Sequence, residues 1–180
     1  EHPCQALADL LTISEYKEDL NKLTVTFIGD GNNVATSLAL AATALGANFL
    51  IASPNEYQLP KDVIKRVENI AQQTSALFLQ IKDPNEAAQK ADVIYTDVWT
   101  SMGWEQETQQ RRIAFAEYQI TDELMAAARP DAIFMHCLPA LRGEEVSDSV
   151  IESKQSVVFE QAENRLHAQK ALLIMLLGKE

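Results

Sequence analysis

The stretch LTVTFIGDGNNVATSLALAATALGANFLIA, residues 23–52, decides the fold. Residues 23–28 alternate polar and apolar side chains and are rich in β-branched ones, which is typical of a strand. Residues 34–44 are apolar and rich in alanine up to Gly46, a residue type that often follows the end of a helix. Residues 48–52 then form a second apolar run. A strand, a helix and a strand in about 30 residues make a βαβ unit with parallel strands, so we predict an α/β fold.

Further elements extend this unit into a three-layer, Rossmann-like domain with a mostly parallel sheet of about five strands. The residue pattern predicts additional strands at 76–81, 93–96 and 133–135, and helices at about 3–14, 62–74, 83–88, 111–117, 121–128, 148–151 and 162–177. We expect one domain over residues 1–180, since a chain of this length buries a core of ordinary size.

Composition narrows the class of protein. The net charge of −11 argues against a nucleic-acid partner. We also expect no membrane partner, because no apolar run reaches transmembrane length and the first residues lack a signal-peptide pattern. Two cysteines give no disulfide framework and suit a reducing, cytoplasmic compartment. The chain begins at Glu1 rather than at Met, so we expect a fragment or a processed product.

The stretch AIFMHCLP, residues 132–139, predicts a ligand site. Pro139 must end the strand, because proline cannot continue a central ladder. His136 and Cys137 then lie at the carboxyl end of a strand, where open α/β sheets bind ligands. A cysteine becomes reactive where positive charge favours its thiolate, and Arg142 follows closely. The alternative is a buried structural thiol.

The turn GDGNNV, residues 29–34, resembles a dinucleotide-binding fingerprint only superficially. Val34 replaces the third glycine, and the next strand ends in Ser53-Pro54 without the acidic residue that would bind a ribose. Asn32 and Asn33 nevertheless follow a strand end, where their amides would clamp a small polar ligand.

A long loop, residues 97–105, follows another strand end, and long loops at this edge are usually functional. Asp97 at its start is suited to bind an amine. The loop also carries Trp99 and Trp104, which either shape a site or only anchor the loop.

Both ends of the chain carry further signals. His2 and Gln5 flank the first turn of the first predicted helix, where free N–H groups suit an anion; a frayed terminus is the alternative. Residues 171–177 are apolar on every side of the last helix, so a missing domain or another subunit is expected to cover them. The residues of metal-binding type, which lack ligand spacing and predict no metal site, are His2, Cys4, His136, Cys137 and His167.

Five stretches together resemble the C-terminal, amino-acid-binding half of the ornithine carbamoyltransferases, in the aspartate/ornithine carbamoyltransferase family. The matching stretches, in the family's order, are residues 2–5, 29–33, 97–103, 136–139 and 163–165. The resemblance implies transfer of the carbamoyl group of carbamoyl phosphate to the δ-amine of L-ornithine. The products would be L-citrulline and phosphate, in arginine metabolism, with no metal and no organic cofactor.

The resemblance also implies a role for each matching residue. The implied catalytic residues are His2, Asp97 and Cys137. The implied ornithine contacts are Asn33, Asp97, Ser101, Met102 and Cys137, and the implied carbamoyl phosphate contacts are His2, Gln5, Cys137, Leu138 and Arg165. Asp97 would orient the δ-ammonium, Cys137 would help to receive its proton, and His2 would stabilise the carbonyl oxygen as it gains charge.

The family's N-terminal domain, with its phosphate-binding loop, is absent from this sequence. The resemblance therefore implies that the isolated chain is inactive, and that the intact enzyme is a trimer-based homo-oligomer. Carbamoyl transfer to another amine such as putrescine and a non-catalytic amino-acid-binding module are the alternatives, with a dinucleotide oxidoreductase behind them.

Overall fold

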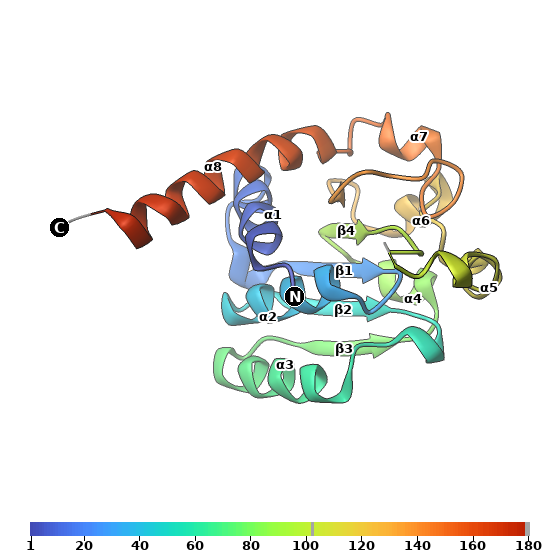
Figure 1. Ribbon diagram of the computed structural model, residues 1–180, viewed down its shortest axis with the longest axis horizontal. Coiled ribbons are helices and arrows are strands. Elements are labelled where there is room, and N and C mark those ends of the chain that lie inside the picture. The colour runs from blue at the N-terminus through green and yellow to red at the C-terminus, as the bar shows by residue number, and fades with distance from the viewer. Residues whose placement is uncertain (102, 179–180) are drawn as a thin grey trace.

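A computed structural model describes residues 1–101 and 103–178, apart from the side chain of Lys22 (Figure 1). It contains a five-stranded sheet in the order β3-β2-β1-β4-β5, and every pairing between neighbouring strands is parallel. The strands are β1 (Thr24–Ile28), β2 (Asn48–Ala52), β3 (Phe78–Ile81), β4 (Val93–Thr96) and β5 (Ile133–His136). The predicted α/β fold is therefore confirmed.

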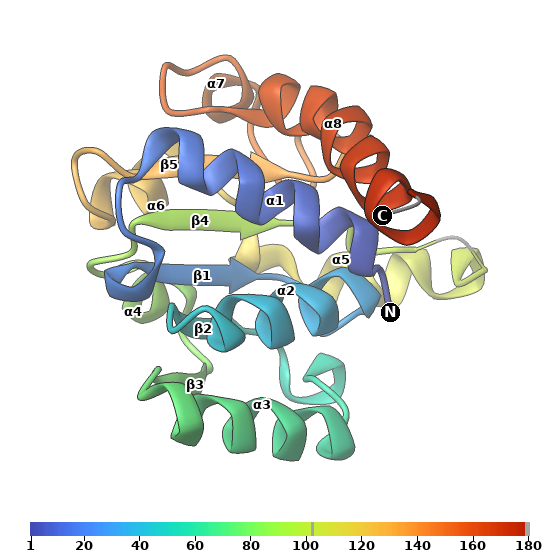
Figure 2. The same ribbon diagram turned by 90° about the vertical axis from the view of Figure 1, so that its left-hand side faces the viewer.

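Helices cover both faces of this sheet. They are α1 (Pro3–Tyr16), α2 (Asn33–Ala44), α3 (Lys61–Thr74), α4 (Pro84–Ala88), α5 (Thr108–Ala114), α6 (Asp122–Ala127), α7 (Asp148–Ile151) and α8 (Val158–Leu177). Short 3₁₀ turns occupy Leu20–Lys22, Asn55–Tyr57, Glu105–Glu107 and Ala116–Tyr118. Figure 2 shows α1, α2 and α3 in front of the strands, with α4 and α6 behind them.

Alternation along each strand divides the core into two layers. Phe27 of β1 and Tyr95 of β4 stack on each other on the face that α1 and α2 cover. Their neighbours Ile28 and Ile94 point to the opposite face, where they pack with Phe134 under α4 and α6. The arrangement is the expected three-layer, Rossmann-like one.

Three predicted elements differ in their boundaries from those observed. The strand predicted at 76–81 begins only at Phe78, because the backbone N–H of Leu77 is taken by the side chain of Asn48. The helix predicted at 111–117 is α5 followed by a 3₁₀ turn. The last helix begins at Val158 rather than at residue 162. The N–H of Val157 donates to the carbonyl of Phe134 in β5, and the helix starts here because Val157 and Val158 are both buried.

The strand order places a crevice between β1 and β4. From β1 the chain proceeds outward through β2 to β3, then returns to the other side of β1 to form β4. Connections therefore leave the carboxyl ends of β1 and β4 in opposite directions, and ligands bind at such a switch point.

Helix α8 extends away from the rest of the molecule (Figure 1). Its first half packs on α1 and β5, whereas its second half is uncovered. The exposed apolar side chains there are Leu173, Ile174, Met175, Leu176 and Leu177. We call these exposed side chains the α8 apolar end. They lie where the sequence predicts that another domain or subunit covers the helix. Across the part of the chain that the structure describes, no helix has the length and apolarity to cross a membrane.

Candidate functional site

A cleft of about 880 Å³ opens at the carboxyl ends of β1, β4 and β5. The predicted site residues that line it are His2, Asn33, Asp97, Ser101, Cys137 and Leu138. Met102, the other predicted ornithine contact, lies outside the described residues. Gln5 and Arg165 do not line this cleft and instead form a cluster with His2 at its border.

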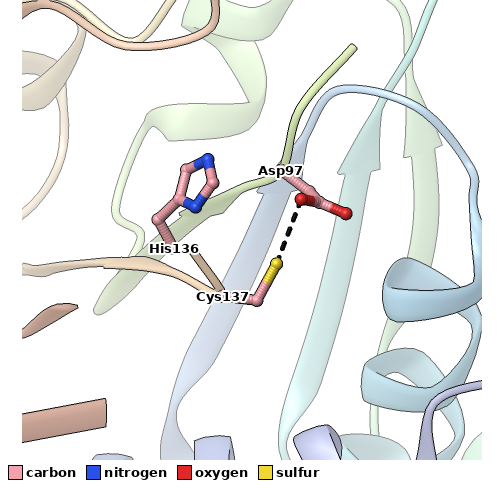
Figure 3. A group of neighbouring side chains, drawn as sticks. All are labelled: Asp97, His136 and Cys137. Carbon is pink, nitrogen blue, oxygen red and sulfur yellow. Dashed lines mark hydrogen bonds between the residues drawn. The ribbon is translucent and has the colours of Figure 1, made fainter. Parts of the chain in front are cut away.

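Asp97 follows β4 at the bottom of this cleft and is only 7% exposed. One carboxylate oxygen, Oδ2, accepts a hydrogen bond from Asn32 Nδ2 at 2.7 Å. The other, Oδ1, accepts from the backbone N–H of Val98 at 2.8 Å and from Cys137 Sγ at 3.0 Å (Figure 3). Three donors on one side chain match an acceptor-only carboxylate, and they hold it in one orientation.

Cys137 is a protonated thiol in this environment. Burial raises the pKa of its thiol, and the negative charge of Asp97 raises it further. Arg142, which the sequence suggested as a source of positive charge, pairs instead with Asp148 and Glu152 at 3.1 and 2.6 Å. The expectation that Arg142 favours a thiolate is therefore wrong.

The two asparagines after β1 have separate tasks. Asn32 caps α2, since its Oδ1 accepts from the N–H groups of Val34 and Ala35, and its Nδ2 is spent on Asp97. Asn33 alone keeps a free-standing amide at the cleft, so the predicted amide pair is reduced to one residue.

Gly31 lets this turn lie against its neighbour. A Cβ built on Gly31 would come within 2.5 Å of the backbone of residues 58–59. Gly31 thus serves the close packing of this turn.

His136 is fully buried and both of its ring nitrogens have partners. Its Nδ1 accepts from the backbone N–H of Leu138 at 2.9 Å, so its Nε2 carries the proton and donates to Glu145 Oε1 at 3.1 Å. Glu145 Oε1 also accepts from the N–H of Leu141 at 2.6 Å, so the pair holds the loop after β5 in place.

Among the described residues, one group has the composition of a metal site: Asp97, His136 and Cys137. These side chains fit a metal ion poorly. Both nitrogens of His136 are engaged, and a metal needs the thiolate of Cys137, whose raised pKa opposes its formation.

A second cluster borders the cleft at the start of α1. His2 precedes this helix, and its N–H donates to Ser37 Oγ at 2.7 Å. Burial lowers the pKa of its imidazole, and the nearby charge of Arg165 lowers it further. Gln5, 1% exposed, accepts a short hydrogen bond from Arg165 Nη1 through its Oε1. The predicted carbamoyl phosphate contacts His2, Gln5 and Arg165 are thus neighbours across α1 and α8.

The long loop after β4 is anchored by Trp99, a candidate anchor in the sequence, and by Arg111, which the sequence did not single out. Trp99 is buried against Phe115, so it serves as the anchor. Trp104 is 52% exposed at the cleft. Arg111 joins the loop after β4 to the turn after β1, because its guanidinium lies 2.7 Å from Asp30 and 2.8 Å from the carbonyl of Trp99.

The role of Arg111 could not be read from the sequence. Its spacing from Glu107 indicates a helical i,i+4 pair, which does form at 3.1 Å. Its second partner, Asp30, lies 81 residues away, and only the fold brings the two together. The residues around the cleft that the sequence missed in this way are Asp30, Arg111 and Glu145.

Comparisons with known proteins give one consistent result. The family model described as "Aspartate/ornithine carbamoyltransferase, Asp/Orn binding domain" matches residues 21–176. An ornithine carbamoyltransferase of Archaeoglobus fulgidus is 52% identical over 180 residues, which cover 100% of this chain and 57% of that protein. The one from Thermococcus kodakarensis is 54% identical over 177 residues, which cover 98% of this chain and 56% of that protein.

Similarity extends to solved structures. The structure of ornithine carbamoyltransferase from Pyrococcus furiosus superposes with a TM-score of 0.96 at 52% identity, covering 100% of this chain and 57% of that one. The chain therefore spans a little over half the length of the relatives that it matches.

Proposed function

The chain belongs to the aspartate/ornithine carbamoyltransferase family, whose Asp/Orn-binding domain it matches, and from this premise we propose that it is the ornithine-binding part of an ornithine carbamoyltransferase. The intact enzyme would transfer the carbamoyl group of carbamoyl phosphate to the δ-amine of L-ornithine, giving L-citrulline and phosphate. The observation that carries the proposal is one cleft that gathers the carboxylate of Asp97 and the imidazole of His2.

The acceptor side uses Asp97 to bind the δ-amine. A lysine-like amine has a pKa of about 10.4 in water and attacks a carbonyl only after losing a proton. Asp97 would accept a hydrogen bond from the ammonium and orient it. Cys137, a neutral thiol, would help to aim that carboxylate rather than take the proton as a thiolate. Asn33 and Ser101, with Met102, would bind the α-amino and α-carboxylate groups.

The donor side uses His2 to stabilise the carbonyl oxygen. A neutral imidazole still offers one N–H, and the lowered pKa of His2 favours that form. The oxygen gains negative charge when the amine attacks, so a donor aimed at it lowers the barrier. Gln5, Arg165 and the carbonyl of Leu138 would complete the carbamoyl phosphate contacts. The N–H of Leu138 is already taken by His136.

The reaction balances without a cofactor. The C–N bond forms on the carbamoyl carbon, and the C–O bond to phosphate breaks with its electron pair leaving on phosphate. The ammonium loses two protons on the way to the ureido group. One proton ends on phosphate and the other is released.

The rest of the enzyme would supply what this chain lacks. We propose that residues 1–180 are one acceptor domain and that a carbamoyl phosphate domain with a phosphate-binding loop accompanies it in a trimer-based homo-oligomer. The α8 apolar end supports a packing partner of this kind. We also propose a cytoplasmic location and a role in arginine metabolism, supported by two free thiols and the matching relatives.

The test is colorimetric detection of ureido product from carbamoyl phosphate. The full gene product that contains this sequence and the 180-residue chain alone are each offered ornithine, putrescine and aspartate. Product from ornithine, with the full gene product only, is the expected result. Product from putrescine instead would reassign the acceptor. Binding of ornithine without product from either polypeptide would favour the non-catalytic binding module.

A further inference from the structure

A buried polar network links the start of α1 to the end of β5. At its centre is Asp9, a fully buried carboxyl on α1. Its Oδ1 accepts from Gln5 Nε2 at 2.8 Å and from Gln161 Nε2 at 2.7 Å. Its Oδ2 accepts from the hydroxyl of Tyr95 at 3.1 Å.

Two chains of hydrogen bonds lead to Asp9, and Gln161 Nε2 also donates to the Tyr95 hydroxyl at 3.0 Å. On one side, Arg165 donates to Gln5 Oε1, and Gln5 Nε2 donates to Asp9. On the other side, the backbone N–H of His136 donates to Gln161 Oε1 at 2.9 Å, and Gln161 Nε2 donates to Asp9. Oδ1 of Asp9 is the acceptor that faces both glutamine NH₂ groups, so it fixes which end of each amide points toward it.

We propose that Asp9 is a positioning residue, which holds the Gln5 amide with its oxygen toward Arg165 and the carbamoyl phosphate site. The proposal rests on the function proposed above. The amino group of the carbamoyl moiety is a donor, so it needs an acceptor such as Gln5 Oε1. A flipped Gln5 would present its own NH₂ to that amino group and to the guanidinium of Arg165, which are also donors.

Burial of Asp9 makes this orientation strict. Desolvation raises the pKa of its carboxyl to about 7, opposed by the hydrogen bonds from Gln5, Gln161 and Tyr95 and by the charge of Arg165. Arg165 is the cation among the groups that shift this pKa, and it reaches the network through Gln5. Losing one buried donor–acceptor match costs more than an exposed hydrogen bond gains.

The variant Asp9→Leu tests the orientation, because leucine is close in size and offers no acceptor. Asp9→Asn would be silent, since its oxygen can stay toward both glutamines while its NH₂ group donates to the Tyr95 hydroxyl. In Asp9→Leu, Gln161 keeps its bonds to the His136 N–H and the Tyr95 hydroxyl, whereas Gln5 Nε2 loses its partner, so we expect the Gln5 amide to lose its fixed orientation. In the full gene product the KM for carbamoyl phosphate should rise about tenfold or more, and the KM for ornithine should change less than about twofold.

Tyr95→Phe is the matched control, because it removes a donor to the same carboxyl and leaves the Gln5 bond in place. It should leave the KM for carbamoyl phosphate unchanged. Adding Gln5→Glu to Asp9→Leu should restore affinity, since a carboxylate presents an acceptor oxygen to Arg165 in either orientation. This double variant also keeps the test decisive if Asp9→Leu alone does not fold.

The outcomes separate the two proposals. A wild-type gene product that makes no ureido product overturns the proposed function and this role with it. An active wild type overturns only the role of Asp9 in two cases. In one, Asp9→Leu leaves the KM for carbamoyl phosphate unchanged. In the other, the KM values of both substrates rise equally, or Gln5→Glu fails to rescue.

Discussion

Asp97 and Cys137 lie 40 residues apart in sequence, yet their side chains are in hydrogen-bond contact. The contact arises because β4 and β5 are parallel neighbours that end at the same edge of the sheet. A thiol beside a carboxylate donates to it, so the two side chains are joined without transfer of the thiol proton.

We expect Asp97→Asn to lower kcat for ureido formation by about 100-fold or more, the range of general acid–base contributions. The amide keeps the shape of the side chain but replaces one acceptor oxygen with a donor, which would repel the δ-ammonium. Steady-state kinetics of the full gene product measure the effect. Glu105→Gln, an exposed change on the same loop, is the control and should leave kcat unchanged. A kcat within threefold of wild type for Asp97→Asn would remove Asp97 from amine activation.

At the scale of the elements, one N-cap residue contributes both to the stability of its helix and to the geometry of the cleft. Asn32 caps α2 and also binds Asp97, whereas Thr121 caps α6 by accepting from the N–H of Leu124 at 3.3 Å, remote from the cleft. The two caps therefore separate a stability effect from a catalytic one.

Asn32→Ala and Thr121→Ala should each lower the free energy of unfolding by about 1 kcal/mol, the usual cost of a lost cap. Only Asn32→Ala should also lower kcat, because it frees one side of Asp97. Urea unfolding and steady-state kinetics measure the two effects. Equal kinetics for both variants would mean that the bond from Asn32 to Asp97 has no catalytic role.

Elements were predictable where their signal is local. The alternation in residues 23–28, the cap at Thr121 and the proline after β5 each report a short-range preference, and the corresponding strands and helix are confirmed. The distant partners of Asp9 and Arg111 were not predictable, because only the fold brings Gln161 to Asp9 and Asp30 to Arg111. A buried Asp on an apolar helix face is the one signal that would have directed attention to Asp9.

At the scale of the whole molecule, Asp9 makes stability depend on pH. Its pKa of about 7 in the folded chain lies well above the usual value of 3.8. Between these two values the folded state holds a proton that the unfolded state has lost. Stability therefore falls as pH rises from about 4 to about 7, by up to about 4 kcal/mol from this group, and then levels off.

Urea unfolding of wild type and of Asp9→Asn at several pH values checks this slope. The free energy of unfolding of the wild type should fall relative to that of Asp9→Asn as pH rises, since the asparagine side chain does not titrate. A difference that is constant from pH 4 to pH 8 would contradict the raised pKa.

The α8 apolar end should give the isolated chain an exposed hydrophobic surface that binds other apolar molecules. Met175 is 81% exposed and its apolar neighbours extend the patch around the helix. We expect the chain to bind a hydrophobic dye or to self-associate, and the double variant Ile174→Glu with Met175→Glu to abolish this. Glu163→Gln, an exposed change on the same helix, is the control. Dye binding that persists in the double variant would place the dye-binding hydrophobic surface elsewhere.

The protonated state of Cys137 has a consequence for covalent labelling. Maleimides react with thiolates, so a half-buried thiol with a raised pKa reacts slowly. Ser75 is exposed in the turn between α3 and β3, at the sheet edge opposite the cleft. A Cys4→Ala, Ser75→Cys variant would therefore take a fluorophore selectively at that turn, leaving the ligand-binding edge free for titration.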